Sequence, residues 1–162
     1  MRKFITTCAI LTILFFFTSA FNAYDIDTKV NSFAPNFTVF DNGKQVKLSD
    51  YRGRFVLVNF WSSENPESRI KNIVYNSFST EYSKLISLVS VNFDKTEGLF
   101  DEILKKDKLE NKSHYFEQDG KNSEVYKKYH LNSGYSSFLI SREGRIIAIN
   151  PTKQELTKLT CQ

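Results

Sequence analysis

The sequence contains little cysteine, since only Cys8 and Cys161 occur among its 162 residues. Two cysteines exclude a scaffold of several disulfides and a zinc site built from four thiolates. The charge excess is also small, because 22 Lys and Arg face 18 Asp and Glu, for a formal charge of +4. This excess is scattered along the chain and does not predict a nucleic-acid-binding protein.

The longest apolar run lies at the N-terminus, over Phe4–Phe17, and is shorter than the roughly 20 residues that a membrane-spanning helix needs. It follows Arg2 and Lys3 and precedes small residues, an order typical of a secretory signal peptide. We predict a signal peptide over residues 1–23, cleaved after about residue 20 or 23. The expected location is the periplasm or cell envelope. Secretion and an uncleaved N-terminal anchor are the alternatives.

The rest of the chain, residues 24–162, is expected to form one domain. Phe55–Trp61 and Leu85–Phe93 are almost continuously apolar, as in strands covered on both faces. Between them, apolar residues recur every three or four positions, which predicts an amphipathic helix. The residues expected on its buried face are Ile70, Ile73, Val74, Phe78, Tyr82 and Leu85. A strand, a helix and a second strand in this order predict a parallel βαβ unit.

The other expected elements complete an α/β fold, a central mixed sheet with helices on both faces. The turn Asp41-Asn42-Gly43 predicts a hairpin, and Leu99, Phe100, Ile103 and Leu104 predict the inner face of a second helix. The remaining expected elements are strands at His114–Glu117, Ser137–Ile140 and Arg145–Ile149, and helices at Ser123–Tyr129 and Gln154–Leu159.

Several segments resemble the TlpA/ResA-like thiol–disulfide oxidoreductases, thioredoxin-fold members of the AhpC/TSA redoxin family. The matching segments are Ala34-Pro35-Asn36-Phe37, Gly43, Val46–Gly53, Val56–Trp61 and the tail Phe138-Leu139-Ile140 with Gly144. The resemblance covers about Phe33 to Ile149. It implies a thioredoxin-like three-layer sandwich for residues 24–162.

The family carries a Trp-x-x-x-Cys-Pro-x-Cys-Arg pattern, in which the first cysteine is the nucleophile and the second resolves the mixed disulfide. The matching run here is Trp61-Ser62-Ser63-Glu64-Asn65-Pro66-Glu67-Ser68-Arg69. By this resemblance, Asn65 and Ser68 occupy the two cysteine positions, and neither side chain forms a disulfide. Asn65 before Pro66 still suits a helix start, since Asn caps well and Pro fits the first helical position.

The family also places a cis-proline beside its cysteine pair, and counting back from Phe138 and from Gly144 puts Tyr135 at that position. A cis bond before a non-proline residue costs about 3 kcal/mol, so the bond before Tyr135 is predicted to be trans. The resemblance then implies a binding surface around these two loops. Its expected residues are Trp61, Ser62, Ser63, Glu64, Asn65, Pro66, Gly134, Tyr135 and Ser136.

Other chemistry has weaker support in the sequence. No nucleophile-elbow glycine pattern surrounds Ser62 or Ser63, so neither is expected to be a catalytic nucleophile. His114 and His130 lack the spacing of paired metal ligands. No catalytic residue, metal or cofactor is therefore expected. The leading interpretation is a non-catalytic binding or accessory module whose partner is a protein or peptide. No binding to nucleic acid is expected, and contact with a membrane is expected only if the N-terminal segment stays uncleaved. The alternative is thiol chemistry through the free thiol of Cys161.

Overall fold

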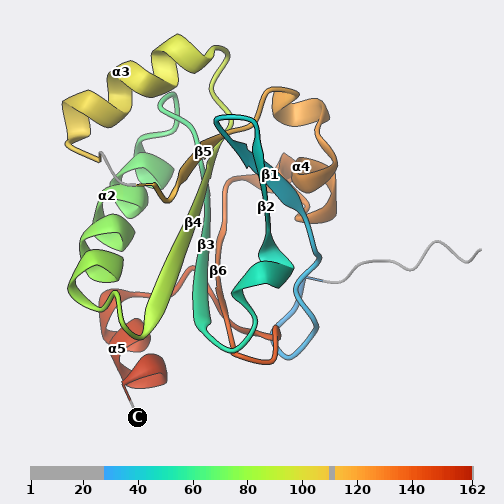
Figure 1. The fold of residues 1–162 in the computed structure, drawn as a ribbon, viewed down its shortest axis with the longest axis vertical. Helices are drawn as coiled ribbons and strands as arrows, with labels where there is room; N and C mark the ends of the chain where they lie inside the picture. The colour runs from blue at the N-terminus through green and yellow to red at the C-terminus, as the bar shows by residue number, and fades with distance from the viewer. Residues whose placement is uncertain (1–27, 110–111, 162) are drawn as a thin grey trace, which may run out of the picture.

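The computed structural model describes residues 28–109 and 112–161, so Cys8 and the predicted signal peptide lie outside the described residues. A five-stranded mixed sheet runs through the molecule in the order β5-β4-β3-β6-β7, and β1 and β2 form a separate hairpin (Figure 1). The strands are β1 Thr38–Asp41, β2 Lys44–Lys47, β3 Phe55–Trp61, β4 Ile86–Asn92, β5 His114–Phe116, β6 Ser137–Ile140 and β7 Ile146–Ile149. The α-helices are α2 Pro66–Glu81, α3 Glu97–Asp107, α4 Glu124–Lys128 and α5 Lys153–Thr160.

The sheet is mixed because β3, β4 and β5 are parallel while β6 and β7 are antiparallel to their neighbours. Side chains alternate between the two faces of a strand. Val56, Val58 and Phe60 of β3 pack with the β1–β2 hairpin and α4, whereas Leu57 packs with α2 and α5. Helices therefore cover both faces, which confirms the predicted three-layer α/β fold (Figure 1).

Aromatic rings fill the layer between the sheet and α4. The ring of Phe60 lies 4.7 Å from that of Tyr129 and 5.9 Å from that of Phe37, centroid to centroid. The Tyr129 hydroxyl donates a hydrogen bond of 2.8 Å to the carbonyl of Pro35, which satisfies its buried polar end. The first segment of the domain is thereby fixed to α4.

The expected elements match the observed ones closely, and β3 has the predicted bounds. The last strand begins at Ile146 rather than Arg145, because Arg145 forms an isolated antiparallel bridge with Phe33. Within the described ranges, no helix is long and apolar enough to span a membrane.

The predicted buried face of α2 is wrong in part. Leu85 is exposed and lies beyond the end of α2. Ile70, Ile73 and Val74 are also exposed, to 61%, 39% and 39%, while Asn72 and Tyr75 are buried. The cause is a polar patch on the sheet beneath the helix. The Asn72 Oδ1 atom accepts hydrogen bonds from Asn59 Nδ2 at 3.1 Å and from Ser90 Oγ at 2.6 Å, and Ser137 Oγ donates to Asn59 Oδ1 at 2.8 Å. The face of α2 that packs on the sheet is therefore the one that carries Asn72, and not the most apolar face of the helix.

Candidate functional site

The candidate site lies where the parallel strands β3 and β4 end. Trp61 and Asn92 are paired at the last position of the two strands, so the residues that follow each strand are neighbours. Ser62 and Ser63 follow β3, and Phe93 and Asp94 follow β4. Tyr135 lies in the loop before β6, which runs antiparallel to β3 and therefore starts at the same end of the sheet.

The carboxylate of Asp94 organises the loop after β3. Its Oδ1 atom accepts hydrogen bonds from Ser62 Oγ at 2.7 Å, from the Ser63 backbone N–H at 2.7 Å and from Ser63 Oγ at 3.0 Å. Its Oδ2 atom accepts one from Asn92 Nδ2 at 3.1 Å. Asp94 is 4% exposed, and hydrogen bonding of this kind is what allows a carboxylate to be buried.

Polar side chains at the start of α2 form hydrogen bonds with the backbone groups there. Asn65 is the N-cap and its Oδ1 accepts a 2.8 Å hydrogen bond from the Ser68 N–H, with Pro66 at the first helical position. The Ser68 hydroxyl, 3% exposed as a residue, donates to the carbonyls of Asn65 at 3.0 Å and Ser62 at 3.4 Å. The predicted helix start is confirmed, and Asn65 and Ser68 sit in direct contact.

Tyr135 covers this loop from the opposite side. Its ring stacks on Phe93 at 5.9 Å between centroids with 19° between the planes. Burial raises the pKa of the Tyr135 hydroxyl, and a hydrogen bond with Ser62 opposes that shift. Every peptide bond in the described part of the chain is trans, including the bond before Tyr135.

These groups border an open cavity of about 580 Å³. Its lining residues are Ser62, Glu64, Asn65, Phe93, Asp94, Lys95, Gln118, Asp119, Gly120, Lys121 and Tyr135. A second cavity of about 260 Å³ shares Gln118 and Asp119 with it and extends along β5 to the β1–β2 turn. The site is thus a polar depression with acidic and basic side chains on its rim.

The structure brings together most of the surface residues expected from the sequence, with two corrections. Ser62 is 4% exposed and its hydroxyl is bound to Asp94, so it supports the loop from within. Trp61 has no exposed surface and packs against Phe100 of α3, so it supports the loop and offers no contact to a partner. Ser63, Asn65 and Ser136 are half-buried, while Glu64, Pro66 and Gly134 are exposed. Glu64 pairs with Lys95 at 2.8 Å.

Sequence reasoning missed Asp94, Phe93, Lys95 and the segment 118–121. For Asp94 a signal existed, because residues that directly follow neighbouring parallel strands meet at one end of a sheet. The 118–121 segment gave no comparable signal, since it reaches the site through the turn after the three-residue strand β5.

The arrangement carries polar binding groups without a thiol among the residues that line it. Cys161, the one cysteine in the described ranges, is exposed at the C-terminal end of α5, near Tyr82 at the far end of α2 from Asn65. Neither His114 nor His130 lines the larger cavity, whereas His114 lines the second one. Within the described residues no group of three or more His, Cys, Asp or Glu side chains is placed to hold a metal ion.

A mixed sheet with this strand order and a helix that begins directly after its central strand defines the thioredoxin-like class. The AhpC/TSA family profile matches residues 30–149, and the chain belongs to this family. The thiol-disulfide oxidoreductase ResA of Bacillus thuringiensis is 28% identical over 127 residues, which cover 77% of this chain and 70% of ResA.

Two solved structures give the same result. A thioredoxin-like protein from Parabacteroides distasonis is 33% identical, with a TM-score of 0.70 over 82% of this chain and 94% of that one. A thiol-disulfide oxidoreductase from Bacteroides fragilis is 25% identical, with a TM-score of 0.68 over 79% and 96% of the two chains. The thioredoxin-like fold expected from the sequence is confirmed.

Proposed function

We propose that this protein is an exported, thioredoxin-like binding module whose site no longer carries out thiol–disulfide exchange. The observation that supports it most is the pair Asn65 and Ser68 at the start of α2. The two side chains bind the backbone of the helix start, Asn65 through its cap on the Ser68 N–H and Ser68 through two carbonyls. Neither is a redox group, and the proposal assigns them the positions of the family's two cysteines.

The loop before β6 supports a role in binding. Tyr135 presents a half-buried ring beside an open cavity, and a half-buried tyrosine offers both an apolar face and a polar end to a partner. We assign the contact surface to Ser63, Asn65, Tyr135 and Ser136 and expect a protein or peptide partner. Export to the cell envelope is supported by the basic, apolar and small-residue order of residues 2–20.

The alternative is a thiol–disulfide role through Cys161. The thiol is exposed, but it lies at the opposite end of α2 from Asn65. Since α2 has 16 residues, this places it roughly 24 Å along the helix axis from the candidate site. A single thiol can form a mixed disulfide but has no second cysteine in the described ranges to resolve it.

A disulfide-exchange assay separates the two functions. The proposed function predicts no turnover of insulin disulfides by the wild-type protein or by Cys161→Ser. Turnover by the wild type that disappears in Cys161→Ser would establish the alternative. Binding is tested by placing a photo-crosslinking residue at Tyr135 and, as the matched control, at the exposed Thr80 on α2. Cross-links to one host protein from position 135 and none from position 80 support the assigned surface; equal cross-linking contradicts it.

A further inference from the structure

The sheet separates charge between its two ends. Parallel strands begin at one edge of a sheet and end at the other. A basic residue stands one or two positions before each parallel strand: Arg54 before β3, Lys84 before β4 and Lys112 before β5. Acidic residues follow two of these strands within two positions: Asp94 after β4 and Glu117 after β5. The candidate site therefore lies at the end opposite to these cations.

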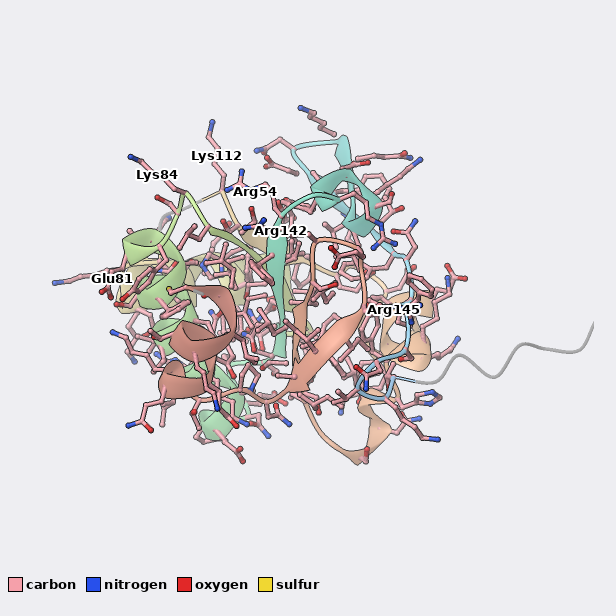
Figure 2. The ribbon with its side chains drawn as sticks, turned by 90° about the horizontal axis from the view of Figure 1, so that it is seen from below. Arg54, Glu81, Lys84, Lys112, Arg142 and Arg145 are labelled. Carbon is pink, nitrogen blue, oxygen red and sulfur yellow. The ribbon has the colours of Figure 1, made fainter. Side chains whose placement is uncertain are left out.

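The β6–β7 turn adds two further cations at the basic end. Arg142 follows β6 and Arg145 precedes β7. We call Arg54, Lys84, Lys112, Arg142 and Arg145 the basic pole. Figure 2 views the molecule from this end and shows Arg54, Lys84, Lys112 and Arg142 around the strand starts, with Arg145 set apart from them.

Hydrogen bonds to backbone carbonyls hold the turns of the basic pole together. The Arg54 Nη2 atom donates to the carbonyl of Ser83 at 2.8 Å, and the Gly53 N–H donates to the carbonyl of Arg142 at 2.9 Å. Ser83 and Ser113 line one cavity of about 350 Å³, so the segments that carry Lys84 and Lys112 meet there. The turns that carry Arg54, Lys84, Lys112 and Arg142 are therefore neighbours at this end of the sheet.

The charges of this surface are available to a partner. All five side chains belong to exposed residues, and none forms an ion pair within the described residues. The acidic residues next to these cations in the sequence, Glu81 and Glu143, have other partners. Lys153 pairs with Glu81 at 3.3 Å, and the Ser141 hydroxyl donates a hydrogen bond to Glu143. By comparison, the exposed Lys95 and Lys153 are each paired with a glutamate.

We propose that the basic pole binds the anionic surface of a phospholipid bilayer and turns the candidate site away from the membrane. A cluster of lysines and arginines on one face is attracted to anionic lipid head groups. The beginning of the domain lies at this pole, because the Arg145 Nη1 atom donates to the carbonyl of Asn31 at 2.7 Å. Thirteen residues separate the apolar run Phe4–Phe17 from Asn31, so an uncleaved run would be joined to the domain on the side of Arg145.

A bilayer fits the basic pole better than a nucleic acid. The cations stand on separate turns at the tips of strands, and the cavity among them is lined mainly by serines, tyrosine and aliphatic side chains. Nucleic acid binding uses a basic groove with aromatic platforms for the bases. The inference does not depend on the proposed function of the site, because no basic-pole residue lines the site cavity.

The test is co-sedimentation of the purified full chain with vesicles of phosphatidylcholine alone and of phosphatidylcholine with phosphatidylglycerol. The apolar N-terminal run would bind both kinds of vesicle, so the dependence on phosphatidylglycerol reports the electrostatic contribution. At roughly fivefold per lysine near the surface, Lys84→Gln/Lys112→Gln is expected to lower the phosphatidylglycerol-dependent partition about 25-fold. The matched control is Lys105→Gln/Lys106→Gln on α3, which removes the same charge from exposed residues outside the basic pole.

The control variant is expected to change the partition less than about twofold, and added salt is expected to release the wild-type protein. Three results would overturn the proposal. The first is wild-type binding that does not depend on phosphatidylglycerol, and the second is an equal loss of binding in the two double variants. The third is binding to duplex DNA that, at the same salt, is as strong as binding to the vesicles and as sensitive to Lys84→Gln/Lys112→Gln. Circular dichroism of both variants excludes unfolding as the cause of a loss.

Discussion

The hydroxyl of Ser62 donates a hydrogen bond of 2.7 Å to the carboxylate of Asp94, and both residues are 4% exposed. This contact joins the loop after β3 to the loop after β4. The Asp94 carboxylate accepts three further hydrogen bonds, from the backbone N–H and the hydroxyl of Ser63 and from the side chain of Asn92. All four of these donors are uncharged groups. The shape of the candidate site depends on this single side chain.

We predict that Asp94→Ala lowers the free energy of unfolding by about 2–4 kcal/mol, because it leaves several buried donors without an acceptor. Urea unfolding followed by circular dichroism measures the change. Asp101→Ala is the control, since Asp101 is exposed on α3 and should change the stability by less than about 0.5 kcal/mol. Similar losses in both variants would contradict the role given to Asp94.

The cap of α2 gives a second prediction. Asn65→Ala is expected to cost about 1 kcal/mol, because the Ser68 N–H loses its side-chain acceptor, whereas Asn65→Asp should retain most of the stability. The urea midpoints of the three proteins test this. If the alanine and aspartate variants lose stability equally, the cap does not contribute as described.

Arg69 and Asp107 connect α2 to α3 through two hydrogen bonds, Nε to Oδ2 at 2.7 Å and Nη2 to Oδ1 at 2.6 Å. Because the Asp107 side chain is 8% exposed, removing its partner leaves a poorly solvated carboxylate. We expect Arg69→Met to destabilise the protein by about 1–3 kcal/mol. Lys71→Met removes an exposed (i, i+4) pair with Glu67 and should cost less than about 0.5 kcal/mol in the same assay.

His114 makes the stability depend on pH. Its Nε2 atom lies 3.2 Å from the Asn76 Oδ1 acceptor, so Nε2 carries the hydrogen, while the buried Nδ1 atom has no partner. Burial lowers the pKa of His114 to about 4 from an ordinary value near 6.5. Between these values the unfolded chain binds a proton that the folded protein does not. Stability is therefore lost as the pH falls from about 6.5 to about 4, by up to roughly 3 kcal/mol.

Urea unfolding at about pH 7 and about pH 4.5 measures this loss in the wild type and in His114→Gln. The variant should lose less stability between the two pH values, since carboxylates titrate in both proteins and cancel in the difference. His130→Gln serves as the control because His130 is exposed. An unchanged pH dependence in His114→Gln would show that the imidazole is not the responsible group.

The sequence predicted the strands well where the local pattern decides the structure. Phe55–Trp61 is apolar enough to be buried wherever it lies, and Asn65 with Pro66 marks a helix start by local chemistry alone. The buried face of α2 was not predictable in this way. Its orientation depends on Asn59, Asn72, Ser90 and Ser137, which are far apart in the sequence and form hydrogen bonds with one another only when the sheet is assembled.

The same distinction holds for the site. The loop after β3 was found because its residues are contiguous, from Ser62 to Pro66. Trp61 was expected both in a buried strand and on the binding surface, and the second expectation was wrong. Phe100 of α3, some forty residues later in the chain, packs against it, and such a long-range contact leaves no local pattern. Asp94 was missed because it follows β4, whereas its partners Ser62 and Ser63 follow β3, about thirty residues earlier in the chain.

The central proposal is that Asn65 and Ser68, at the start of α2, stand where a redoxin carries its two cysteines and so leave this position without thiol chemistry. The most direct test compares the rate of insulin disulfide reduction by the wild-type protein with that of Asn65→Cys/Ser68→Cys in the Cys161→Ser background. We predict a background rate for the wild type, and for the variant a reversible disulfide with reduction above background. Turnover by the wild type, or a folded variant that forms the disulfide and yet reduces nothing, would contradict the account.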